Sequence, residues 1–143
     1  MKRQDDELLR AVSDAIGVLG DRWSLAVIAA LLDGPLRYGE LQGRLPKIAP
    51  NILSARLKKL EQEGLVVAAP YSERPVRVEY RLSGDGHELD GLLRLLAAWG
   101  ASLGNSDLTL THADCGTALE VRWWCPACAE PVDPAADESD LRV

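Results

Sequence analysis

The residues of this sequence that are best suited to chemistry lie near its C-terminal end, where all three cysteines are found. His112 precedes Cys115 by three positions, and Cys125 precedes Cys128 by three positions. A gap of two residues lets a short chain fold into a knuckle that presents both side chains to one ion. Four nitrogen and sulfur ligands suit tetrahedral zinc. We therefore predict a Zn²⁺ site made by His112, Cys115, Cys125 and Cys128.

The chain around these four ligands is too short to fold by apolar burial alone. A segment of about 25 residues, 108–132, has too little core to fold without a cross-link such as a bound metal ion. Residues 119–123, between the two pairs, are expected to form strands, so the segment resembles a rubredoxin-like zinc ribbon. Metal binding would contribute on the order of 10 kcal/mol to its folding. Four protein ligands leave no position for water, so the zinc is expected to be structural.

Three other interpretations of the cysteines are open, namely unligated thiols, iron in place of zinc, and a zinc deaminase. The paired spacing argues against unligated thiols, and the histidine favours zinc over iron. A deaminase needs the patterns H-x-E and P-C-x-x-C. Here Asp114 stands in the place of the Glu, and Trp124 precedes Cys125. We therefore expect no enzyme.

The elements before this segment are expected to be mainly helical, with one β-hairpin. Apolar residues recur at helical spacing over residues 8–19. Asp21 suits the N-cap of a second helix, which Gly34 and Pro35 end. The remaining elements, in the order helix, helix, hairpin and long helix, are expected at residues 38–45, 50–63, 65–82 and 85–103.

Two short helices, a tight turn between them and a following hairpin make up a winged helix-turn-helix, an α+β fold whose second helix enters the major groove. Leu53, Leu57 and Leu60 fall on one stripe of that helix and are expected to be buried. Its other face offers an amide, a hydroxyl and basic groups, which suit base edges and phosphates. The residues predicted to contact DNA are Pro50, Asn51, Ser54, Arg56, Lys58 and Lys59 on the helix and Arg74 and Arg77 on the hairpin.

The net charge of −6 at first argues against nucleic acid, because a domain that neutralises phosphates is usually basic. The charges are segregated along the chain, however. Residues 37–82 hold nine basic and five acidic residues and carry +4, whereas residues 104–143 carry −6. The whole positive excess therefore lies in the segment predicted to bind DNA.

Several spaced motifs occur in order in the same part of the chain: Gly20-Asp21-Arg22-Trp23, LLDGPLRYGEL at 31–41, IAPNILSARLKKLE at 48–61 and RPVRVEYRL at 74–82. In these motifs the chain resembles the HxlR-type transcriptional regulators over about residues 8–103. The resemblance implies a homodimer, built by the first and last helices of the domain, that binds double-stranded operator DNA. Apolar residues of 85–103 cover more of the helix circumference than one core-facing side requires, which independently favours a dimer.

One position departs from that family. Many members carry a Cys-Pro pair in the first helix, which some use as a thiol sensor. Spacing back from Trp23 puts Arg10 in the place of that cysteine. Thiol sensing at this position is therefore not expected.

The chain is thus expected to comprise a winged-helix domain at 1–103, a zinc ribbon at 104–132 and a disordered acidic tail at 133–143. No export signal or membrane segment is visible in the sequence, so a cytoplasmic protein is expected. The alternative function is a protein-interaction module, in which the ribbon binds a protein partner and the winged helix does not bind DNA.

Overall fold

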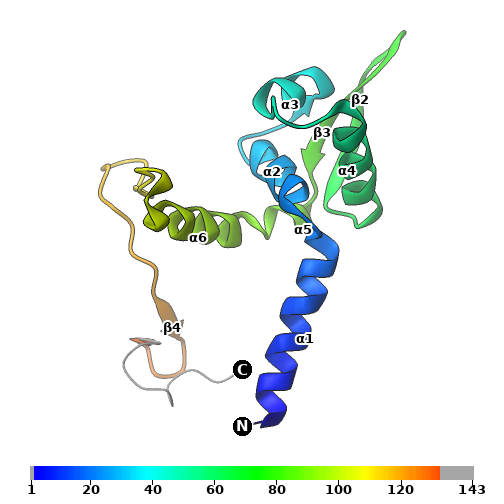
Figure 1. Ribbon diagram of the computed structural model, residues 1–143. Coiled ribbons are helices and arrows are strands. Elements are labelled where there is room, and N and C mark those ends of the chain that lie inside the picture. Colours follow the sequence, from blue (N-terminus) through cyan, green and yellow to red (C-terminus); the bar gives the residue numbers. More distant parts are fainter. Residues whose placement is uncertain (1, 133–143) are drawn as a thin grey trace.

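The computed structural model of the protein describes residues 2–132, with side chains described for residues 6–104 and 106–132. A winged-helix body carries two projecting helices and a small C-terminal segment (Figure 1). The elements follow in the order α1 Lys2–Leu19, α2 Arg22–Leu31, β1 Leu36–Arg37, α3 Tyr38–Arg44, α4 Pro50–Gln62, β2 Val66–Glu73, β3 Val76–Leu82, α5 Gly84–His87, α6 Asp90–Gly100, a π-helical turn Ala101–Asn105, β4 Trp123–Cys125 and β5 Glu130–Val132.

The sheet of the body has three antiparallel strands in the order β1-β3-β2. The two long strands form the predicted hairpin, with Glu73 opposite Val76 at its tip and a register shift between Pro70 and Ser72. The short strand β1, which the sequence argument did not include, pairs Leu36 with Tyr80. The hairpin projects from the body beside α4, in the position of a wing (Figure 1).

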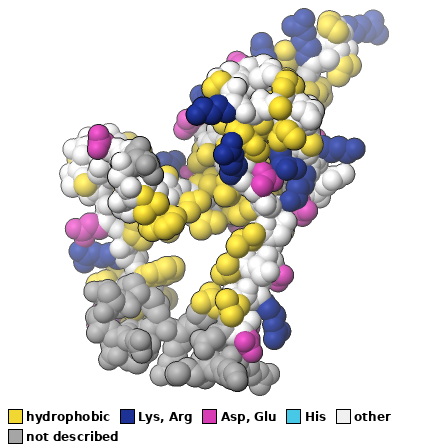
Figure 2. All heavy atoms as spheres, viewed as in Figure 1, with side chains coloured by type: hydrophobic (Ala, Val, Ile, Leu, Met, Phe, Trp, Pro, Cys, Tyr) yellow, Lys and Arg dark blue, Asp and Glu magenta, His cyan; other side chains and the backbone are white. Residues whose placement is uncertain are grey.

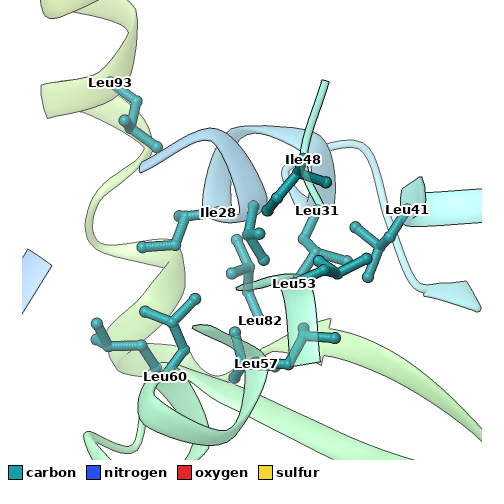
Figure 3. Close-up of a cluster of buried hydrophobic side chains, with 12 residues drawn as sticks. Ile28, Leu31, Leu41, Ile48, Leu53, Leu57, Leu60, Leu82 and Leu93 are labelled. Carbon is teal, nitrogen blue, oxygen red and sulfur yellow. The ribbon is translucent and has the colours of Figure 1, made fainter. Parts of the chain in front are cut away.

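The core of the body forms where α4 packs against α2. Leu53, Leu57 and Leu60 are at most 2% exposed, as their spacing predicts. They point into the same apolar cluster as Ile28 and Leu31 of α2 (Figure 3). Proline at the first helical position and the left-handed Gly64, with φ of 73°, bound the helix that carries them. Burial of this stripe fixes which side of α4 faces outward.

The two helices α1 and α6 project from the body (Figure 1). Of the described side chains of α1, only Val18 and Leu19 pack against the core cluster. Leu93 of α6 reaches the core and is 7% exposed (Figure 3). Both helices therefore leave an apolar side uncovered within one chain.

The prediction of a single helix over residues 85–103 is wrong, because helix α5 ends at His87 and a second helix follows. Ser83 caps the short helix α5 by accepting a hydrogen bond from the Gly86 N–H, at 3.0 Å. Gly86 is packed so closely against the Leu65 carbonyl that a Cβ there would collide with it. The Leu89 N–H bonds to the Gly86 carbonyl, three residues back instead of four, and α6 begins at Asp90. The first helix also differs from its predicted bounds, since it starts at Lys2.

The C-terminal segment contains a two-stranded hairpin and one isolated bridge between Thr111 and Ala118. The strands predicted at 119–123 form only at residue 123, because β4 pairs with β5 across the turn at 125–128. Residues 119–122 belong to no strand, although the Leu119 N–H bonds to the Leu110 carbonyl at 2.7 Å. The tail predicted at 133–143 lies outside the described residues. None of the described helices is long and apolar enough to cross a membrane.

Replacing Leu57 with Ala should lower the free energy of unfolding by about 2–5 kcal/mol, because it leaves a cavity between α4 and α2. Urea denaturation followed by circular dichroism measures the change. The control is Val76→Ala at the tip of the wing, where the side chain is 74% exposed. That variant should stay within about 0.5 kcal/mol of the parent protein. Equal losses in the two variants would contradict the placement of the core.

Candidate nucleic-acid interface and cysteine knuckles

The outward side of α4 carries the first group of predicted DNA contacts. Asn51 and Lys58 are exposed on the side opposite the leucine stripe, and Pro50 is exposed at the first helical position. The described residues offer Lys58 no carboxylate within ion-pair distance, so its charge is available to a ligand. An amide and an ammonium group on an exposed helix can reach base edges and phosphates.

Ser54 is exposed on α4, but its hydroxyl belongs to a small network. It donates to the Tyr38 hydroxyl at 3.2 Å, and Tyr38 donates to the Pro50 carbonyl at 2.9 Å. This chain of bonds ties the start of α3 to the first turn of α4. Tyr38 is not among the residues predicted from the sequence, and nothing in the local pattern signals it, because the contact spans 12 positions.

Arg56 does not point outward as predicted. Its Nε lies 2.7 Å from Asp21 Oδ2. That nitrogen is buried and makes no hydrogen bond of good geometry, so the contact is an ion pair. Burial raises the pKa of the Asp21 carboxyl, but hydrogen bonds from the Trp23 and Ser24 N–H groups and the Arg56 charge outweigh it. The pKa therefore lies below its usual value.

Lys59 also turns inward, and its Nζ donates to the Gly17 carbonyl at 3.3 Å. Gly17 lies in the last turn of α1, where free carbonyl groups favour a cation. Lys59 is only partly exposed. Both flanking cations of α4 thus have partners within the protein while remaining partly exposed.

The wing carries the second group of predicted contacts. Arg74 and Arg77 are both exposed, at the tip and on β3. Arg37, opposite Glu79 in β1, is a further exposed cation of the basic segment 37–82. Its guanidinium stacks over the Tyr71 ring of β2, at 4.3 Å from the ring centre. Lysine and arginine side chains gather around the hairpin and α4, and hydrophobic side chains line α1 (Figure 2).

The two cysteine pairs form knuckles of the same shape. Gly116 N–H bonds to the His112 carbonyl at 2.8 Å, and Ala129 N–H bonds to the Cys125 carbonyl at 2.9 Å. The residue after each second ligand is left-handed, with φ of 70° at Gly116 and 55° at Ala129. This conformation costs energy for a residue with a Cβ. Ala129 nevertheless adopts it, so the turn geometry is imposed by the knuckle.

Each knuckle brings its two predicted ligands together. Cys115 Sγ lies 3.4 Å from His112 Nδ1. A hydrogen bond with the Thr117 hydroxyl, together with the Thr117 N–H, lowers the pKa of the Cys115 thiol. Backbone and side-chain hydrogen bonds from Cys128 lower the pKa of the Cys125 thiol. Within residues 2–132 no three potential ligands gather around one point, so the two knuckles lie apart.

A helix-turn-helix followed by a wing, with exposed cations on α4 and the hairpin, defines a DNA-binding transcriptional regulator of the winged-helix class. The sequence matches the HxlR-like helix-turn-helix family over residues 18–107. This protein therefore belongs to that family.

Relatives in the same family are similar over most of the chain. An uncharacterized HTH-type transcriptional regulator of Methanothermobacter thermautotrophicus is 39% identical over 101 residues, covering 71% of this chain and 77% of its own. An uncharacterized HTH-type regulator of Mycobacterium tuberculosis is 32% identical over 126 residues, 85% of this chain and 79% of its own. Both relatives are named as transcriptional regulators.

A solved structure gives the same fold. The crystal structure of the HTH-type transcriptional regulator YtcD, a protein of Bacillus subtilis, superposes with a TM-score of 0.62 at 35% identity. The match covers 66% of this chain and 97% of that chain. The match to the HxlR-like family model over residues 18–107 confirms the resemblance that the sequence motifs indicated, and this structure shows the same fold.

Replacing Lys58 with Gln should weaken DNA binding and lower the salt slope of the binding constant by about one, as loss of one phosphate contact does. Titration of labelled duplex at several salt concentrations measures both quantities. The matched control is Arg94→Gln on α6, whose cation pairs with Asp90 at 2.6 Å. It should change neither. A normal slope in Lys58→Gln would contradict the outward placement of this lysine.

Proposed function

We propose that this protein regulates transcription as a homodimer on operator DNA, with a structural zinc ion in its C-terminal segment. The observation that carries the proposal is the outward side of α4, where Asn51 and Lys58 are exposed beside the arginines of the wing. Family membership supports DNA binding itself. The dimer and the zinc rest on separate observations, given below.

In this proposal α4 enters the major groove with its N-terminal turn foremost. An asparagine amide matches the N6 and N7 edge of adenine, which makes Asn51 the best candidate for direct base recognition. Lys58 sits two turns further along and would neutralise phosphate. Arg74 and Arg77 would hold the sugar-phosphate backbone or the minor groove beside the wing.

The homodimer is supported by two uncovered apolar stripes. On α1, the exposed fractions are 45% for Leu8, 67% for Leu9, 48% for Val12 and 61% for Ile16. On α6, they are 49% for Leu92, 39% for Leu95, 42% for Leu96 and 61% for Trp99. Patches of this extent on projecting helices mark a protein interface. A second copy offers both stripes by symmetry, so each α1 and α6 gains a partner.

A symmetric dimer would place two copies of α4 on one face of DNA. Operators bound in this way contain two inverted half-sites about one helical turn, or 34–36 Å, apart. The basic surfaces lie on the body and wing, whereas the apolar stripes lie on the projecting helices (Figure 2). The proposed dimer contacts therefore leave the DNA-binding side free.

Replacing Leu9 with Glu should shift the protein from dimer to monomer and weaken operator binding at least tenfold, because a charge in the apolar contact is costly to bury. Sedimentation measures the mass, and gel shift on fragments retained by the wild-type protein measures binding. Arg10→Gln, on the opposite side of α1, is the control and should stay dimeric.

Two results would contradict the proposal. A wild-type monomer that binds its operator tightly would remove the dimer. A wild-type protein that binds no DNA would instead favour the protein-interaction module, whose supporting observation is the exposure of apolar ribbon side chains, 54–61% for Leu119, Val121, Trp123 and Trp124.

Zinc is supported by the match between the two knuckles. His112 and Cys115 would supply nitrogen and sulfur from one, and Cys125 and Cys128 would supply two sulfurs from the other. This donor set suits Zn²⁺, which as a bound ion would join the knuckles and leave no position for a substrate. The surrounding chain is almost entirely exposed, so it has no apolar core that could hold the knuckles together.

Elemental analysis of protein purified without chelator should give about one zinc per chain. Cys128→Ser should lose most of the metal and free the C-terminal segment, which protease cleavage after residue 105 would detect. Ser106→Ala, which alters a nearby hydroxyl that accepts from the Leu108 N–H, is the control. A wild-type protein without metal would contradict the zinc site.

A further inference from the structure

Two basic residues on one side of α4 hold the junction between α1 and α2. This junction consists of Gly20 and Asp21, between the end of α1 and the start of α2. Arg56 pairs with Asp21 at 2.7 Å, and Lys59, one turn later, donates to Gly17 at 3.3 Å. Helix α4, the recognition helix of the proposed function, therefore contacts both helices that meet at this junction.

The junction is itself tightly constrained. Asp21 caps α2 by accepting from the N–H groups of Trp23, at 2.8 Å, and Ser24, at 3.2 Å. Gly20 closes α1 with a left-handed φ of 67° and bonds to the Ile16 carbonyl at 2.6 Å. The chain thus has little freedom to turn at this point without moving one of these partners.

The rest of α1 has no such support. Its described side chains before Val18 are exposed, and the helix leaves the body in Figure 1. A change in the direction of α1 would act on the body through the junction, and there Arg56 and Lys59 connect it to α4.

We propose that Arg56 and Lys59 are positioning residues that lock α4 to the base of α1, so that the seating of α1 in the dimer sets the angle of the recognition helix. The proposal rests on the proposed function and extends it to regulation. Whatever shifts α1 at the dimer contact would tilt both recognition helices and change the half-site spacing that the dimer accepts.

The test compares Arg56→Gln, Asp21→Asn, their double variant and Lys58→Gln in the full chain. Asparagine keeps the N-cap of α2, so Asp21→Asn removes only the charge. Arg56→Gln and Asp21→Asn should each weaken operator binding about fivefold without changing the salt slope of the binding constant. The double variant should bind the operator no more weakly than either single variant. Lys58→Gln should lower the slope instead. A lowered slope in Arg56→Gln, additive with Asp21→Asn, would mean that Arg56 contacts phosphate and would overturn the proposal.

A second measurement separates positioning from mere stability. The operator is changed by one base pair between its half-sites, and the loss of affinity is compared. In Arg56→Gln and Lys59→Gln this loss of affinity should be at least threefold smaller than in the wild type, because the angle of α4 is no longer held. An unchanged penalty in both variants would overturn the coupling.

A third measurement needs no DNA, so it distinguishes failure of this inference from failure of the proposed function. Amide exchange at Trp23 and Ser24 should be at least threefold faster in Arg56→Gln, since the Asp21 cap loses its charge partner. Arg94→Gln, which removes another arginine–aspartate pair, should leave those amides unchanged. Unaltered exchange in Arg56→Gln would overturn the lock even if operator binding fails for other reasons.

Discussion

The packing of α4 against α2 is the constraint on which the rest of this structure depends. Three leucines at helical spacing, Leu53, Leu57 and Leu60, are almost fully buried, and their burial determines the rotation of the helix about its axis. Once that rotation is set, Asn51 and Lys58 must face outward. Arg56 and Lys59 fall on the boundary between buried and exposed sides. The same apolar contact thus sorts the polar residues of α4 into those that face solvent and those that face the protein.

The distribution of uncovered surface separates the tasks of the molecule. Cations are exposed on the body and wing, and apolar side chains are exposed on α1 and α6 (Figure 2). Apolar surface of this extent is costly in water, which is a physical reason to expect a partner on those helices. A net charge of −6 is compatible with DNA binding for the same reason of segregation, since the positive excess lies in residues 37–82.

The C-terminal segment differs from the body in the interactions that could hold it together. Each knuckle is closed by its own hydrogen bond over four residues, which local sequence suffices to form. Joining the two knuckles needs a force that acts between them, and the described side chains there are too exposed to provide it. A metal ion with four strong bonds would provide such a force. Local geometry therefore accounts for each knuckle, whereas their union depends on the proposed zinc ion.

The sequence by itself determined the helix-turn-helix, the wing, the buried stripe of α4 and the exposure of Lys58, Arg74 and Arg77. These follow from hydrophobic period, caps and turns, which act over a few residues. Only the tertiary structure decided that Arg56 and Lys59 turn inward, because Asp21 and Gly17 lie far away in sequence. It also decided the break after His87, in a turn where Gly86 packs closely on the Leu65 carbonyl. Long side chains at the edge of a buried stripe can point either way, and the nearest partner in space settles the choice.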